Sequence, residues 1–317
     1  MKKIEHRLLL PVVLIIVLVG IFRFFEASTY PEDTNKTGDL QQDKRERDFF
    51  TSVPIPDHLL FAGEKVPLEY FDVHESLDRE LLVNSYFHSQ TLRFLKMAPR
   101  YFEMIEPILR ADTVPLDFKY LALAESGFDA RAVSPSGAVG FWQFMKGTAT
   151  DYGLEVNDEV DERYHIELST HAACRYLKDS YKKYGSWTLV AASYNAGRRF
   201  VDRQMTRQNE KDYYDLLVGE ETGRYVFRIL ALKLVMENPE SYGFKVTEKE
   251  KYPRWKTSKI DVNTPVPDFA ALAQQHGTNY KIFKMLNPWL RENYLTNAKG
   301  KTYTFKLPVK GFRTIKN

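Results

Sequence analysis

The sequence predicts a mainly α-helical domain followed by a small β-α-α-β module near the C-terminal end. Apolar residues recur at steps of three, four or seven over much of residues 76–237, which is the spacing of one helix face. Alternating strand patterns are few before residue 240. In residues 259–308 a strand pattern, two helix patterns and a second strand pattern follow one another. With 317 residues and 44% hydrophobic content, the chain suffices for one large domain or two smaller ones.

Residues 1–25 combine a basic start with an apolar run. Lys2, Lys3 and Arg7 precede an apolar segment that extends from Leu8 to Phe22. This is the pattern of a signal peptide or of a short signal anchor, because the run falls short of the ~20 residues that span a bilayer. Either alternative predicts that the basic end stays inside and the rest of the chain is exported.

Two polar stretches divide the remaining chain. Residues 26–57 are rich in charge and contain prolines, which is typical of a linker. Residues 244–258 are rich in Lys and Glu and indicate a connector. The expected organisation is therefore a helical domain over residues 58–243 and a module over residues 259–310.

Charge and cysteine content exclude several classes of protein. The net charge is only +3 and no long block of Lys and Arg runs unbroken, so no nucleic-acid surface is predicted. Cys174 is the single cysteine, which rules out an intramolecular disulfide. Neither a metal nor a cofactor is expected.

Proline and glycine set the expected ends of the helices. Pro99 should break the pattern of residues 76–110 into two helices, and Gly127 should end a helix that begins at Asp117. Further helices are expected over residues 169–184, 187–195, 222–237, 269–276 and 280–286, and strands over residues 259–262 and 302–307.

Glu125 is the strongest candidate for chemistry. Phe118, Leu121 and Ala122 precede it by seven, four and three residues, so they share its helix face. An apolar face and the negative end of the helix dipole beside Gly127 both raise the pKa of a carboxyl group. A carboxylic acid that stays protonated near neutral pH suits cleavage of a glycosidic bond. This pattern alone leaves open a Glu that merely caps or salt-bridges the helix end.

Downstream segments supply the groups of a sugar-binding groove. Residues 134–140 form a loop of small residues, residues 141–145 add aromatic rings and one amide, and residues 193–197 add a phenol and another amide. Amides bond hydroxyl and N-acetyl groups, while aromatic rings stack on sugar faces.

Together these motifs resemble the catalytic domain of family-1 lytic transglycosylases, in particular the membrane-bound D-type group. The likeness covers residues 113–230. It rests on the order and spacing of Glu125-Ser126-Gly127-Phe128, Ser134-Pro135-Ser136-Gly137-Ala138, Gly140-Phe141-Trp142-Gln143-Phe144-Met145, Ala192-Ser193-Tyr194-Asn195-Ala196-Gly197 and Glu221-Thr222-Gly223-Arg224-Tyr225-Val226. Many relatives have Gly-Leu-Met-Gln where this chain has Gly140-Phe141-Trp142-Gln143, a departure that bears on subsite shape rather than on chemistry.

The resemblance implies a lysozyme-like fold and cleavage of the β-1,4 bond between N-acetylmuramic acid and N-acetylglucosamine in bacterial peptidoglycan. It implies that Glu125 acts as acid and then as base, which leaves a 1,6-anhydro sugar. The residues that would bind saccharide are Ser134, Gln143, Tyr194 and Asn195, and those that would support Glu125 are Ser126, Met145 and Tyr225. For Met145 and Tyr225, ordinary packing is the alternative.

A glycoside hydrolase usually needs a second carboxylate. Asp117, Asp129, Asp161 and Glu162 are the candidates, and each is expected to make solvated or capping contacts instead. A lone acid favours the non-hydrolytic route. A lysozyme-type hydrolase and a non-catalytic glycan-binding scaffold of the envelope are the alternatives.

The C-terminal module resembles a LysM peptidoglycan-binding repeat. The likeness rests on Phe269-Ala270-Ala271-Leu272-Ala273, Ile282-Phe283-Lys284-Met285-Leu286-Asn287 and Gly300-Lys301-Thr302-Tyr303, whereas Pro288-Trp289 and the loop after them are atypical. The expected partners are glycan strands and, through the N-terminal segment, a membrane on whose periplasmic side the protein lies. A purely structural appendage is the alternative role for the module.

Overall fold

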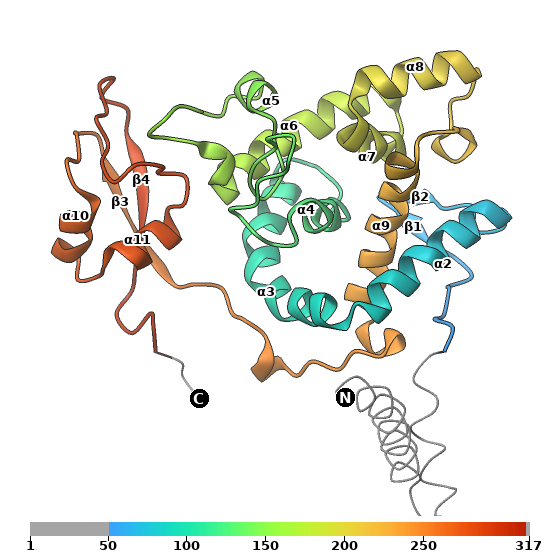
Figure 1. Ribbon diagram of the computed structural model, residues 1–317, viewed down its shortest axis with the longest axis horizontal. Coiled ribbons are helices and arrows are strands. Elements are labelled where there is room, and N and C mark those ends of the chain that lie inside the picture. The colour runs from blue at the N-terminus through green and yellow to red at the C-terminus, as the bar shows by residue number, and fades with distance from the viewer. Residues whose placement is uncertain (1–50, 315–317) are drawn as a thin grey trace, which may run out of the picture. The chain divides into compact units, whose positions relative to one another are not determined.

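A computed structural model describes residues 51–314 as a group of helices followed by a small two-stranded module (Figure 1). The helices are α2 (Phe71–Tyr86), α3 (His88–Ala111), α4 (Phe118–Ser126), α5 (Lys146–Asp151), α6 (Ile166–Tyr184), α7 (Trp187–Ala196), α8 (Arg198–Gln208), α9 (Glu220–Glu237), α10 (Phe269–Gln275) and α11 (Tyr280–Leu286). The strands are β1 (Leu60–Phe61), β2 (Glu64–Lys65), β3 (Thr257–Val262) and β4 (Tyr303–Pro308). The mainly helical class and the β-α-α-β order of the C-terminal module are confirmed.

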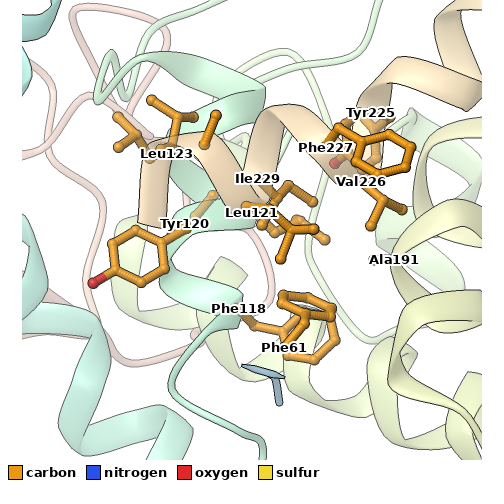
Figure 2. Close-up of a cluster of buried hydrophobic side chains, with 14 of the residues drawn as sticks. Phe61, Phe118, Tyr120, Leu121, Leu123, Ala191, Tyr225, Val226, Phe227 and Ile229 are labelled. Atoms are coloured by element: carbon orange, nitrogen blue, oxygen red, sulfur yellow. The ribbon is translucent and has the colours of Figure 1, made fainter. Parts of the chain in front are cut away.

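Helix α4 lies inside the group formed by α2, α3, α6, α7 and α9 (Figure 1). Its side chains Phe118 and Leu121 are fully buried, and the ring of Phe118 lies 5.5 Å from that of Phe61. Figure 2 shows these residues beside Val226 and Ile229, which α9 contributes to the same core. Because this short helix is buried on nearly all sides, the residues of its last turn are held in a fixed position.

The predicted break at Pro99 is wrong. Helix α3 continues through both Pro99 and Pro107, and the break between α2 and α3 falls at Phe87. A proline inside a helix frees carbonyl groups in the preceding turn. Here the carbonyl of Lys96 accepts a hydrogen bond from the backbone N–H of Tyr252 at 2.7 Å. The connector thus bonds to the turn before Pro99, beside Leu95, whose carbonyl loses its helical donor to the proline, while buried side chains along α3 hold the helix against the core.

The other helix predictions are confirmed, with small differences at the ends. Gly127 ends α4 in the left-handed conformation (φ 56°), as its position predicts. Helix α8 was not predicted, because it has only three large apolar residues, Phe200, Val201 and Met205, of which Val201 alone is fully buried.

The C-terminal module has its own aromatic core. Strands β3 and β4 pair antiparallel, with Ile260 opposite Phe305. The rings of Phe269, Phe283 and Phe305 lie within 5.2–5.9 Å of one another. The Asn287 side chain exchanges two hydrogen bonds of 2.8 Å with the backbone of β4, which fastens the end of α11 to the strand.

The predicted signal peptide or anchor, residues 1–25, lies outside the described residues, as does most of the predicted linker. Val53 and Ile55, at the end of that linker, pack against the helical core. Between residues 51 and 314, none of the helices has the length and apolar character needed to cross a membrane.

Candidate active site

Glu125 occupies the last turn of α4, and its carboxylate accepts a hydrogen bond from the Tyr225 hydroxyl of α9. The two residues are 100 positions apart in the chain and meet because α4 packs along α9. Tyr225 is buried, whereas Glu125 keeps part of its surface exposed. The carboxyl group is therefore held in a fixed position by the core.

Burial raises the pKa of Glu125 to about 7. The hydrogen bond from Tyr225 and the charge of Arg228 lower this pKa, and the charge of Glu221 raises it. Desolvation outweighs the two stabilising contacts, in agreement with the direction that the apolar helix face predicts. A carboxyl group with this pKa exists in both protonation states near neutral pH, which suits a group that must give and then take a proton.

Helix α7 places Tyr194 and Asn195 next to the same region. The Tyr194 hydroxyl donates to the carbonyl of Trp142 at 2.7 Å, and burial together with the nearby Glu125 charge raises the pKa of Tyr194 well above its usual value. The Asn195 side chain accepts a hydrogen bond of 3.2 Å from Thr222, which links α7 to the first turn of α9. Their role in binding saccharide stays a prediction.

Ser134 and Gln143 use their side chains to hold the loop that carries them. The Ser134 hydroxyl accepts from Ala138 N–H at 2.9 Å, and the Gln143 amide donates to the carbonyls of Gly140 (2.8 Å) and Ala132 (3.2 Å). Gln143 also adopts a positive φ of 49°, an uncommon conformation for a non-glycine residue. We call residues 134–145 the substrate loop, after the role that the sequence predicts for Ser134 and Gln143.

The predicted supporting residues Ser126 and Met145 lie in different settings. The Ser126 hydroxyl donates to the carbonyl of Ala122 at 3.0 Å, inside its own helix. Met145 precedes α5 and is 46% exposed, so it is not part of the buried core. Of the three residues expected to support Glu125, Tyr225 is the one that forms a hydrogen bond with it.

Gly140 lies where the substrate loop meets Arg163. Its φ is 84°, and a Cβ atom there would lie 2.0 Å from the Arg163 carbonyl oxygen. We expect Gly140→Ala to lower the free energy of unfolding by at least about 2 kcal/mol, through backbone strain and overpacking. Urea unfolding measures the loss, and Gly147→Ala, where a Cβ atom meets nothing within 4 Å, is the matched control. Equal stability of Gly140→Ala and wild type would show that this contact is absent.

Asp117 and Asp129, two candidates for a second catalytic carboxylate, are engaged elsewhere. Asp117 pairs with Lys233 at 2.7 Å and accepts from the backbone of Ala62 at 2.7 Å. Asp129 accepts from the backbone of Arg131 at 2.9 Å. Asp129 is thus solvated, as the sequence predicts, whereas the prediction is wrong for Asp117, which forms a largely buried ion pair and does not cap α4.

Asp161 and Glu162 are each 6% exposed, so neither is solvated, but Asp161 makes a predicted capping contact by accepting from the Arg163 N–H at 3.2 Å at the start of the short helical turn of residues 162–164. Asp161 receives two hydrogen bonds from the Arg163 guanidinium, at 2.9 and 2.7 Å, and Glu162 pairs with Lys301 at 3.1 Å. These carboxylates are buried because cations from the described chain neutralise them. Across residues 51–314, no group of three or more His, Cys, Asp or Glu side chains is arranged to hold a metal ion.

The sequence reasoning missed Arg228, whose charge acts on Glu125. Arg228 lies three residues after Tyr225 and seven after Glu221, and its guanidinium contacts the Glu221 carboxylate at 3.2 Å. Those helical spacings place the three side chains on neighbouring faces of α9, a signal that was available in the sequence. A cavity of about 410 Å³ opens beside the end of α4, and Ser126, Gly127 and Arg228 are among its lining residues.

Residues 106–217 match the family described as the Transglycosylase SLT domain, and residues 258–311 match the Soluble lytic transglycosylase C-terminal LysM-like domain. The chain is 28% identical over 258 residues to the membrane-bound lytic murein transglycosylase D of Escherichia coli K12, which covers 79% of this chain and 55% of that protein. It is 34% identical over 113 residues to the peptidoglycan transglycosylase gp16 of Escherichia phage T7, which covers 35% of this chain and 8% of that protein.

Among solved structures, the 70 kDa soluble lytic transglycosylase of Escherichia coli aligns with a TM-score of 0.37 and 20% identity, over 49% of this chain and 27% of that one. The chain thus spans about half the length of the curated transglycosylase D that it matches. The SLT match ends before α9, which supplies Tyr225. Residues 106–217 of this mainly helical chain are thus similar to a transglycosylase SLT domain and residues 258–311 to a C-terminal LysM-like domain, and we refer to the two parts by these names.

Proposed function

We propose that this chain is a peptidoglycan lytic transglycosylase that cleaves the β-1,4 bond between N-acetylmuramic acid and N-acetylglucosamine without using water. The observation that carries the proposal is Glu125, a partly exposed residue whose carboxyl group has a pKa of about 7, at the end of a buried helix of the SLT domain. The names of two relatives, a lytic murein transglycosylase and a peptidoglycan transglycosylase, support the same substrate.

In the first step, the Glu125 carboxyl group donates its proton to the glycosidic oxygen, and the bond between that oxygen and C1 of the muramic acid breaks. The Glu125 carboxylate or the N-acetyl group of the same sugar stabilises the positive charge that develops at C1. In the second step, Glu125 takes the proton from the C6 hydroxyl as O6 bonds to C1. The product is a 1,6-anhydromuramyl end, and Glu125 returns to its protonated form.

Two features of the site support a single acid that acts twice. The Tyr225 hydroxyl donates to the Glu125 carboxylate and so stabilises the anion that exists between the two steps. The four candidate partner carboxylates are committed to cations or backbone groups, which leaves none of them as an evident base for water.

We also propose that the protein works in the bacterial cell envelope, on the periplasmic side of a membrane that residues 1–25 contact. The relative described as membrane-bound supports this placement. The proposed organisation is a linker over residues 26–57, the catalytic domain over 58–243, a connector over 244–258 and the LysM-like module over 259–310. The LysM-like match supports binding of the module to glycan strands.

Mass spectrometry of the products from purified peptidoglycan tests the proposed reaction. We expect muropeptides with 1,6-anhydromuramyl ends, each lighter by one water than the hydrolysed form. In H₂¹⁸O these ends acquire no label. Labelled reducing ends would show the lysozyme-type hydrolase instead, and undigested peptidoglycan would favour the glycan-binding scaffold.

The pH dependence of kcat/KM should follow the charges around Glu125. The acid form is needed first, so we expect activity to fall as the pH rises above about 7. Arg228→Gln removes a charge that lowers the Glu125 pKa, so the basic limb should move to higher pH by about half a unit. Glu221→Gln removes a charge that raises this pKa, so the limb should move the opposite way by a similar amount.

Arg199→Gln on α8 is the control for loss of a positive charge, because Arg199 is exposed and is not among the groups that shift the Glu125 pKa. Shifts of Arg228→Gln and Glu221→Gln in the same direction would contradict Glu125 as the titrating acid.

A further inference from the structure

The LysM-like domain packs against residues 155–167 of the SLT domain, which we call the docking segment. Two backbone hydrogen bonds cross between them. The Asp161 N–H donates to the Trp289 carbonyl at 2.8 Å, and the Arg291 N–H donates to the Glu159 carbonyl at 2.7 Å. The loop before β4 thus joins the docking segment as an added strand joins a sheet edge.

An apolar seam lies behind these backbone bonds. Val139, Val160 and Tyr164 of the SLT domain are buried in the same hydrophobic cluster as Trp289 and Leu290 of the LysM-like domain. The core of the SLT domain forms a separate cluster. These three SLT residues therefore depend on the LysM-like domain for their burial, and Trp289, which is atypical of the repeat, serves as a docking side chain.

Ion pairs surround the seam. Lys301 lies 2.7 Å from Glu155 and 3.1 Å from Glu162, and Lys306 lies 2.5 Å from Glu167. In each pair the LysM-like domain supplies the cation and the docking segment supplies the carboxylate. This one-way pattern of charge fixes the orientation in which the two domains meet.

The docking segment also holds the substrate loop. The Arg163 guanidinium, positioned by Asp161, donates to the carbonyls of Phe144 at 3.2 Å and Gly137 at 3.4 Å. Arg163 is 8% exposed, and its own carbonyl group is the one that leaves no room for a Cβ atom at Gly140. Three points of the substrate loop therefore rest on one buried residue of the docking segment.

We propose that the LysM-like domain is a positioning element of the active site. It fixes the docking segment, and Arg163 transmits that constraint as a positioning residue to the loop that carries Ser134 and Gln143. This role is separate from any binding of glycan by the LysM-like domain. The expected effect of the LysM-like domain on the kinetics rests on the proposed function, whereas its expected effect on the substrate loop does not.

Hydrogen–deuterium exchange of the full chain without substrate tests the proposal. The double variant Val160→Asp, Lys301→Glu places one carboxylate in the apolar seam and another against Glu155 and Glu162, so that the LysM-like domain is displaced. Faster exchange of the Asp161 and Arg291 amides reports that displacement. We expect amides of the substrate loop, such as Gly140 and Phe144, to exchange about tenfold faster in the same protein.

Kinetics supply a second readout. We expect the displaced enzyme to show a KM for glycan strands about fivefold higher, with kcat within about twofold of wild type, because Glu125 and Tyr225 stay in the SLT core. Lys299→Glu, an exposed residue of the same loop with the same change of charge, should leave exchange and kinetics unchanged.

A charge exchange provides the rescue. Lys301→Glu alone should speed the exchange of the substrate loop in part, and adding Glu155→Lys to it restores an opposite pair across the seam and should return that exchange toward wild type. The proposal is overturned if the Asp161 and Arg291 amides show that the domain has been displaced while the substrate loop exchanges as in wild type. Because exchange is measured without substrate, a wild-type enzyme that made no anhydro product would refute the proposed reaction and leave this result standing.

Discussion

Replacement of Glu125 by Gln is expected to lower kcat/KM on purified peptidoglycan by about 10³-fold, with KM nearly unchanged. Glutamine keeps the size of the side chain and its place beside Tyr225, but it has no proton to give to the glycosidic oxygen. Release of soluble muropeptides measures the loss. Glu221→Gln, which removes an exposed carboxylate from the same neighbourhood, is the matched control and should retain most activity at pH 6, below the limb of the pH profile that it shifts. Equal digestion by wild type and Glu125→Gln would remove Glu125 from the mechanism.

The same variant should be more stable than wild type at alkaline pH. The pKa of Glu125 is raised in the folded protein, from 4.5 to about 7, so folding favours the protonated form. Stability from this group is complete below pH 4.5 and is lost as the pH rises through 7. At pH 8, Glu125→Gln should therefore gain up to about 3 kcal/mol in the free energy of unfolding, and near pH 4 it should gain almost nothing. Urea unfolding at the two pH values measures the difference.

Asp161→Asn is expected to lower the free energy of unfolding by about 3–5 kcal/mol, because it leaves the buried Arg163 guanidinium without its carboxylate. The double variant Asp161→Asn, Arg163→Met removes both charges and should lose less than Asp161→Asn alone. Asp129→Asn, at an exposed position, is the control and should change stability by no more than about 0.5 kcal/mol. A loss of the same size in the control would show that burial of the Asp161–Arg163 pair does not explain the loss of stability.

Local patterns predicted much of this molecule. Glu125 was identified because the residues that desolvate it lie within two turns of the same helix, and Gly127 marked the helix end that it occupies. The β-α-α-β order of the module followed from short periodic runs between turn residues. In both cases the deciding contacts lie close together in the sequence.

Contacts between distant segments could not be predicted from local sequence patterns. Pro99 predicts a helix break, yet α3 continues through it. Buried side chains along α3 pack against the core, and Tyr252, far along the chain, donates a hydrogen bond to the turn before Pro99. Asp161 and Glu162 look like surface residues in a polar turn, and their burial depends on other parts of the fold. Lys301, which pairs with Glu162, lies 139 residues away, a separation for which no periodic pattern exists.

The hydrogen bond between Tyr252 and Lys96 has a consequence for how far the LysM-like domain can travel. Arg100 reinforces it by donating to the Pro253 carbonyl at 3.1 Å and by lying over the ring of Trp255 at 4.6 Å. Between these contacts and β3 the connector therefore has a single residue, Lys256. Such a short tether keeps the LysM-like domain at a high effective concentration beside its docking segment. If the seam between them opens, we therefore expect the domain to dock again before it can reach a distant glycan strand.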